Sequence, residues 1–241
     1  MNLPPAPFRR LLVPVDFSSR SANALQYAVA FGSLTRAQVD VLHVWHSDLS
    51  TPVTVARDRA KGELRSFVSD LELRGDVELR RRTDHGDPYM TIQSAAQLSG
   101  YDLIVVAGPE PQRVHADSVA RGLLRAAPSP VLFVPAYFQA RYRSDEERVL
   151  KLERLLVPLA LSGSRGQALR RAELLGTHDD AAIEQGASDE DAVGTARRVQ
   201  ASRIDLVVVC GTRARPGDRP SDGRAEAVAL ASPCATLSLP D

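Results

Sequence analysis

Short apolar runs alternate with amphipathic segments along the first 135 residues. The runs consist mainly of Val and Leu and are too short for helices, which is typical of buried parallel strands: "RLLVPVDF", "VDVLHVW", "YDLIVVAG" and "SPVLFVP". A more polar run, "DVELRRRTDHG", indicates an edge strand. Between them lie the predicted helices "SSRSANALQYAVAFGSL", "ARDRAKGELRSFVSDLELRG", "DPYMTIQSAAQLSG" and "DSVARGLLRAA". This α/β alternation predicts a doubly wound, open, parallel five-stranded sheet with a ligand crevice at the carboxyl ends of its strands.

Capping residues predict where several of these elements begin and end. We expect the first strand to end at Asp16, and Ser18 or Ser19 to cap the following helix, which Gly32 can close. Asp87 followed by proline is typical of an N-cap and first helical position.

The later part of the chain repeats this plan in a shorter form. The offset between the two openings, Arg10 and Arg154, is 144 residues, but between Asp102 and Asp205 it is only 103, so 41 residues are missing from the second copy. They are missing after Gly176, where the first copy has its second strand and second helix. We therefore predict a complete domain over 1–140, a charged linker over 141–152 without an apolar stripe, and a reduced second domain over 153–241.

Composition excludes several classes of function. The chain has 30 basic and 30 acidic residues, so no net positive field favours nucleic acid or an anionic membrane. No run approaches the roughly 18 apolar residues of a membrane span, and the N-terminus lacks a signal-peptide apolar region. Two cysteines fall short of a disulfide framework, and a reducing cytoplasmic location is expected.

Motifs for catalysis or metal binding do not emerge from the sequence. His43 and His46 are three residues apart on a predicted strand, where their side chains point to opposite faces, so we expect no metal site there. There is no Ser-His-Asp order, nucleophile elbow or paired-carboxylate motif, and the protein is expected not to be an enzyme. Cys210 and Cys234 are expected to be small buried side chains at opposite ends of the sheet.

Three landmarks in order, "LLVPVDFS", "LHVW" and "DLIVVAG…APSPVLFVP", resemble the universal stress protein family. The resemblance implies an adenine nucleotide alpha hydrolase-like fold, ATP binding in some members, and dimerisation through the last strand. It also implies a set of ligand-binding positions, with phosphates held on a glycine-rich turn: Pro14, Asp16, Val44, Ala107, Gly108, Ser118 and Val119.

The phosphate turn departs from the pattern of the ATP-binding members. Pro111 and Asp117 stand at the second and third glycine positions, which removes a donor N–H and adds negative charge. In the second copy Ala160 replaces the aspartate of the first. We therefore expect weak or absent ATP binding and no cofactor. The alternative is an adenine-nucleotide sensor, in which Asp16 contacts ribose rather than only capping a helix.

The resemblance also implies how the two copies associate. Their last strands, "VLFVP" and "TLSLP", would pair within the chain as a pseudo-dimer, with Val131, Phe133, Thr236 and Leu237 at the seam. The missing strand and helix would leave an exposed edge or apolar patch on the second copy, a candidate surface for a homo-oligomer or a protein partner. The expected function is a non-catalytic regulatory or protective module in the stress response.

Overall fold

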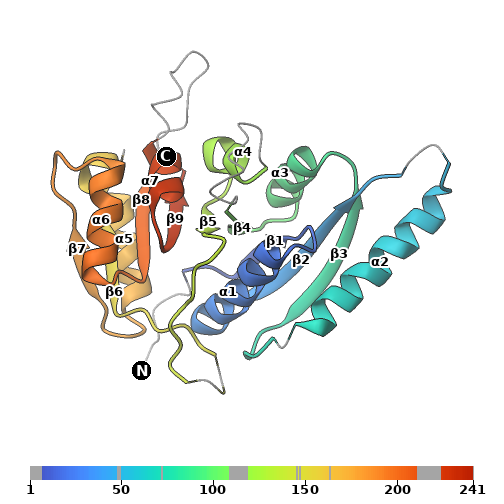
Figure 1. Cartoon of the computed structure of the whole chain (residues 1–241), viewed down its shortest axis with the longest axis horizontal. Coiled ribbons are helices and arrows are strands. Elements are labelled where there is room, and N and C mark those ends of the chain that lie inside the picture. The colour runs from blue at the N-terminus through green and yellow to red at the C-terminus, as the bar shows by residue number, and fades with distance from the viewer. Residues whose placement is uncertain are drawn as a thin grey trace, which may run out of the picture.

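The computed structural model describes residues 7–47, 50–71, 73–108, 119–144, 146, 148–162, 164–210 and 224–240. Within these ranges the strands form a single mostly parallel sheet in the order β3-β2-β1-β4-β5-β9-β8-β6-β7. β5 and β9 pair antiparallel at its centre, and every other neighbouring pair is parallel. The two halves of the chain therefore lie side by side, with β3 and β7 at the outer edges (Figure 1).

The described residues of the first half form five strands and four helices, in the predicted order. The strands are β1 (Arg10–Pro14), β2 (Gln38–Trp45), β3 (Leu79–His85), β4 (Leu103–Ala107) and β5 (Val131–Val134). The helices are α1 (Ser19–Thr35), α2 (Val53–Asp70), α3 (Pro88–Leu98) and α4 (Val119–Ala126). The α/β alternation is confirmed, as is the place of β3 at a sheet edge.

The second half supplies four strands and three α-helices within the described residues. The strands are β6 (Arg154–Val157), β7 (Ala182–Gln185), β8 (Leu206–Cys210) and β9 (Ala235–Leu239). A short 3-10 turn, η1 (Leu159–Leu161), precedes α5 (Arg165–Gly176), α6 (Ala192–Ser202) and α7 (Arg224–Ala231). β7 pairs with β6 and is followed by α6, as β3 is followed by α3. In the second half β7 therefore pairs with the first strand, β6. In the first half that position beside β1 is taken by β2.

On one face of the sheet the hydrophobic core is continuous between the halves. On that face, a cluster that includes Phe8, Phe31 and Leu175 joins α1, α2 and α5 with strands from both halves. On the other face there are two clusters, one under α3 and α4 and one under α6 and α7. Ala229 of α7 nevertheless belongs to the cluster under α3 and α4, so the second half also packs against the first on this face.

Two helix predictions have different outcomes. Asp87 accepts a hydrogen bond from the Met90 N–H at 2.9 Å, which confirms it as the N-cap of α3. The prediction that Gly32 closes α1 is wrong: the helix continues to Thr35, and Arg36, at φ 57°, is the left-handed C-cap. Gly32 is instead needed for close packing, because a Cβ there would lie 2.9 Å from Cγ2 of Val39.

The boundaries at the first strand and at the predicted linker also differ from expectation. β1 ends at Pro14, two residues before Asp16, although the Val15 N–H still donates to the Leu42 carbonyl at 2.8 Å. The segment over 141–152 was expected to lack an apolar stripe, yet its Leu150 and Leu152 side chains are each 1% exposed. Leu150 and Leu152 are therefore packed into the core that joins the halves.

The exposed edge predicted for the second half is present as β7, while its described residues show little exposed apolar surface. α5 packs on β6, β7 and β8, and Val193 is the one large hydrophobic residue there that is more exposed than buried within the described ranges. The edge strand β7 is short and partly polar, with Glu184 paired to Arg154. Cys210 and Cys234 are both buried, as predicted. In the part of the chain that the structure describes, no helix is long and apolar enough to cross a membrane.

Candidate functional site

A cavity of about 220 Å³ opens at the carboxyl ends of β1, β2 and β4, between the starts of α3 and α4. Its walls are mainly apolar and include five of the seven predicted site residues: Pro14, Asp16, Val44, Ala107 and Val119. The other described residues that line it are Val15, Ser21, Leu42, His43, Pro88, Ile92, Val106 and Ala120. The fold thus gathers at one point residues that are more than 100 positions apart in the sequence.

The turn between β1 and α1 places Asp16 at the rim of this cavity. Phe17 adopts φ 63°, a left-handed conformation that is uncommon outside glycine and that bends the chain sharply after Asp16. The Asp16 carboxylate accepts hydrogen bonds from the Ser18 N–H at 3.1 Å and from the Ser18 hydroxyl at 2.5 Å. Ser18, and not Asp16, is the N-cap of α1, since its side chain accepts from the Ser21 N–H. Asp16 remains exposed and is not needed as the cap.

The surroundings of Asp16 keep its carboxyl ionised at neutral pH. Partial burial raises the pKa, but hydrogen bonds from Ser18 and Ser21 and the charge of Arg20 together outweigh burial and lower the pKa below its usual value. Within the described residues, no Lys or Arg lines the cavity. Among the described lining residues, Asp16 therefore contributes a negative charge to the rim, and Arg20 is the cation that acts on it.

His43 lines the cavity although the sequence analysis gave it no role in ligand binding. Its Nδ1 lies 3.0 Å from the Val15 carbonyl oxygen, so Nδ1 carries the hydrogen and the other ring nitrogen is left as an acceptor in the neutral form. The ring stacks on Phe17, with centroids 4.1 Å apart. His43 and Val44 point to opposite faces of β2, but both reach the cavity because it lies at the tip of the strand. The position of His43 next to Val44 was the signal that could have identified it.

Gly108 does not line the cavity. Its N–H donates to the Val134 carbonyl at 2.7 Å, so it extends the pairing of β4 with β5. A Cβ at this position would lie 2.8 Å from Cζ of Phe133. Close packing against this ring therefore explains why the residue is glycine. Ser118, with Pro111 and Asp117 of the predicted phosphate turn, lies outside the described residues.

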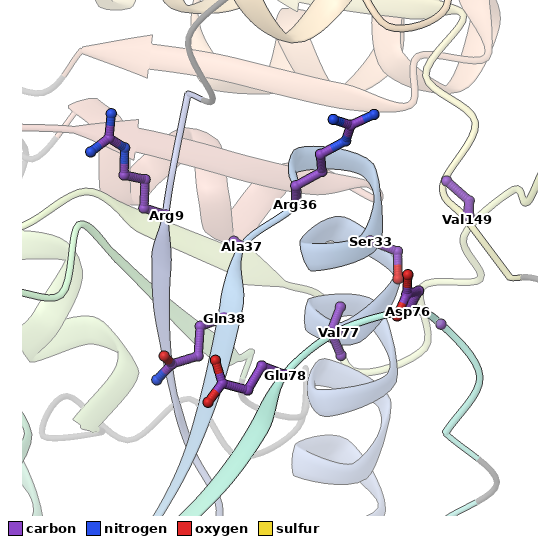
Figure 2. Close-up of a pocket in the computed structure, with 10 residues that line it drawn as sticks. Arg9, Ser33, Arg36, Ala37, Gln38, Asp76, Val77, Glu78 and Val149 are labelled. Atoms are coloured by element: carbon purple, nitrogen blue, oxygen red, sulfur yellow. The ribbon is translucent and has the colours of Figure 1, made fainter.

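The cavity drawn in Figure 2 lies at the opposite, amino-terminal ends of the strands. It measures about 810 Å³ and is lined by Arg9, Ser33, Arg36, Ala37, Gln38, Gly75, Asp76, Val77, Glu78 and Val149. Figure 2 shows the side chains of Arg9 and Arg36 on different elements and not converging on a common point. Among the described residues, no group of three or more His, Cys, Asp or Glu side chains could hold a metal ion.

The comparisons with known proteins agree with this geometry. The family model described as "Universal stress protein family" matches residues 7–135. A universal stress protein from Archaeoglobus fulgidus is similar over 99% of this chain and 98% of its own, with a TM-score of 0.67 and 15% identity. A putative universal stress protein from Pseudomonas aeruginosa covers 97% of this chain and 93% of its own, at a TM-score of 0.61 and 16% identity.

A further structure shares only part of the chain. The Arabidopsis thaliana universal stress protein family protein with AMP bound covers 53% of this chain and 91% of its own, with a TM-score of 0.40 and 19% identity. No curated protein sequence matches the chain. The family match alone spans more than half of the sequence. This chain therefore belongs to the universal stress protein family.

Proposed function

We propose that the protein is a non-catalytic module of the stress response whose first half binds an adenine nucleoside and discriminates against ATP. The observation that carries this proposal is the cavity beside Asp16, where the family's base and ribose positions, Pro14, Asp16 and Val44, come together. We also propose that the protein is cytoplasmic.

The size and the walls of the cavity favour a small and mainly apolar ligand. Pockets that enclose drug-sized ligands usually measure roughly 300–1,000 Å³, and this cavity, at about 220 Å³, lies below that range. Leu42, Val106 and Ile92 supply apolar surface that fits a planar base. The cavity can therefore enclose a base with part of a ribose, while a triphosphate chain would extend out of it.

Charge favours a nucleoside over its phosphates. The ionised Asp16 carboxylate can accept hydrogen bonds from ribose hydroxyls, which are neutral donors. The same carboxylate repels a phosphate chain, and the described lining offers no Lys or Arg in compensation. Affinity should therefore decrease as phosphates are added.

We also infer that the chain is a tandem of two related copies, the second reduced. Equivalent hydrogen bonds support this: in each half, an aspartate beside a central strand accepts from two backbone N–H groups at the start of the opening strand. Asp102 accepts from Arg9 at 2.8 Å and Arg10 at 3.0 Å, and Asp205 accepts from Glu153 at 2.8 Å and Arg154 at 3.0 Å. The antiparallel pairing of Leu132 with Leu237 and Phe133 with Thr236 supports an intrachain pseudo-dimer.

Calorimetric titration of the nucleotide-stripped protein with adenosine, AMP and ATP tests the proposed ligand class. We expect adenosine to bind most tightly and ATP, with magnesium present, to bind at least about tenfold more weakly. ATP binding tighter than adenosine binding would contradict the proposal, because it would require phosphate contacts that outweigh the charge of Asp16.

A matched variant far from the cavity controls for indirect effects. Asp76→Asn removes a carboxylate from the cavity at the amino ends of the strands (Figure 2) and should leave the order of affinities unchanged. A change in that order would mean that the ligands bind at the amino-terminal cavity instead.

A further inference from the structure

The reduced second half contacts the helix that forms one wall of the nucleoside cavity. Val119 and Ala120, the first two residues of α4, line the cavity. The same helix lies between α3 of the first half and α7 of the second half (Figure 1), and packs against both. Its position therefore depends on both halves of the chain.

An ion-pair cluster centred on the buried Glu226 joins α4 to α7. Glu226, in the first turn of α7, is only 4% exposed. Its Oε1 lies 2.7 Å from Nε of Arg121, and its Oε2 lies 2.5 Å from Nε of Arg125. A second guanidinium nitrogen of Arg125 donates to Oε1 at 3.2 Å. Charge-assisted hydrogen bonds of this kind, partly shielded from water, fix the geometry of the groups that they join.

Apolar contacts accompany this cluster. Leu123 of α4 and Ala229 of α7 belong to one hydrophobic cluster, together with Ile92 of α3, which itself lines the cavity. On the side of α3, the Gln93 side chain donates to the Ala126 carbonyl at 2.8 Å. On the α3 side α4 thus contacts the first half, while on the α7 side the contacts of Glu226 add to those of Ala229.

We propose that Glu226 is a positioning residue through which the second half holds α4 and thereby sets the ligand affinity of the cavity in the first half. This inference rests on the proposed nucleoside site. The second half would then have a role without binding a ligand itself, because it holds α4, one wall of the cavity in the first half.

Amide hydrogen exchange and adenosine titration of the full chain, compared between wild type and Glu226→Gln, test this role. The variant keeps the size of the side chain and removes its charge. We expect exchange in α4 (Val119–Ala126) to accelerate by about tenfold or more, and adenosine affinity to fall by a similar factor. The matched control is Glu190→Gln, which removes a carboxylate paired with Arg198 at 3.0 Å within the second half and should change neither quantity.

The outcomes separate this proposal from the proposed function. Unchanged exchange in α4 of the Glu226 variant would overturn the positioning role whether or not adenosine binds. Faster exchange with unchanged adenosine affinity would overturn the link to the cavity. If the wild-type protein does not bind adenosine, the proposed function is refuted, and so is the claim that Glu226 sets ligand affinity. The exchange data would still decide whether Glu226 holds α4.

A compensating variant shows whether the paired charge is responsible. Arg121→Gln combined with Arg125→Gln leaves Glu226 as a buried carboxylate without these two partners, so α4 should exchange fastest in this double variant. Adding Glu226→Gln should then slow exchange again, because the stranded charge is gone. Further acceleration on adding Glu226→Gln would contradict the proposed ion-pair mechanism.

Discussion

At the scale of single residues, two predicted site positions prove to have different surroundings. Asp16 lines the cavity, and hydrogen bonds from Ser18 help to keep its carboxyl ionised. Gly108 does not line the cavity, and its N–H donates to the Val134 carbonyl. A motif identifies which positions lie near a site, but only the pairing of β4 with β5 shows that the Gly108 N–H is already engaged.

Gly108→Ala should destabilise the protein by about 1–3 kcal/mol, because the new Cβ would approach the Phe133 ring to 2.8 Å and force the packing to shift. Thermal unfolding of the variant measures this loss. Gly62→Ala is the control: its Cβ would meet nothing within 4 Å, and alanine favours the helix, so the midpoint should stay equal or rise. Equal midpoints for wild type and Gly108→Ala would contradict the packing explanation.

The lowered pKa of Asp16 predicts a pH-dependent contribution to stability. Because the folded-state pKa lies below the usual value of 3.8, the ionised form is favoured in the folded protein. This contribution is present above that pH and is lost as the pH falls through the folded-state pKa. The difference in unfolding midpoint between wild type and Asp16→Asn should therefore be larger at pH 7 than at pH 3. A difference that grows as the pH falls would mean that folding raises the pKa of Asp16 instead.

At the scale of elements, the order of strands and helices could be predicted because each apolar run ends at a turn or cap residue that the sequence makes visible. The C-terminal end of α1 and the burial of Leu150 and Leu152 could not. Gly32 resembles a helix terminator but makes a tight contact with Val39, and Leu150 and Leu152 follow no periodic pattern yet fill the core between halves. Both depend on contacts between distant segments, which local periodicity does not report.

The N-caps of α3 and α6 provide a matched pair of variants. Asp87 accepts from the Met90 N–H at 2.9 Å, and Asp191 accepts from the Gly194 N–H at 2.7 Å. Replacing either with alanine should cost about 1 kcal/mol in denaturant unfolding. Only Asp87→Ala should also weaken adenosine binding, since Pro88 and Ile92 of α3 line the cavity. Equal effects of the two variants on binding would argue against α3 as a wall of the site.

At the scale of the whole molecule, the halves share one core on one face and an antiparallel strand pair at the centre of the sheet. Phe8 from the N-terminal segment stacks under Arg171 of α5, with the guanidinium carbon 4.7 Å from the ring centroid, and Arg141 pairs with Asp205. Sequence offsets predicted a repeat, but they did not predict these contacts between distant segments. They make independent unfolding of the two halves unfavourable.

The shared core predicts a single unfolding transition in scanning calorimetry. Leu237→Asp places a charge opposite Leu132 in the fully buried β5–β9 pairing and should lower the midpoint of that whole transition, with a loss of several kcal/mol. Two separate transitions in the wild-type protein, only one of them shifted by Leu237→Asp, would show that the halves unfold independently.

Calorimetric titration of the nucleotide-stripped full chain with adenosine, beside the Asp16→Asn variant, tests the central claim most directly. Asn removes the charge and keeps the shape of the side chain, and Asp191→Asn controls for the loss of a carboxylate elsewhere. We predict saturable binding by wild type and by the control, and affinity lower by about tenfold or more in Asp16→Asn. Absence of binding at millimolar adenosine, or equal affinity in all three proteins, would contradict a nucleoside site at Asp16.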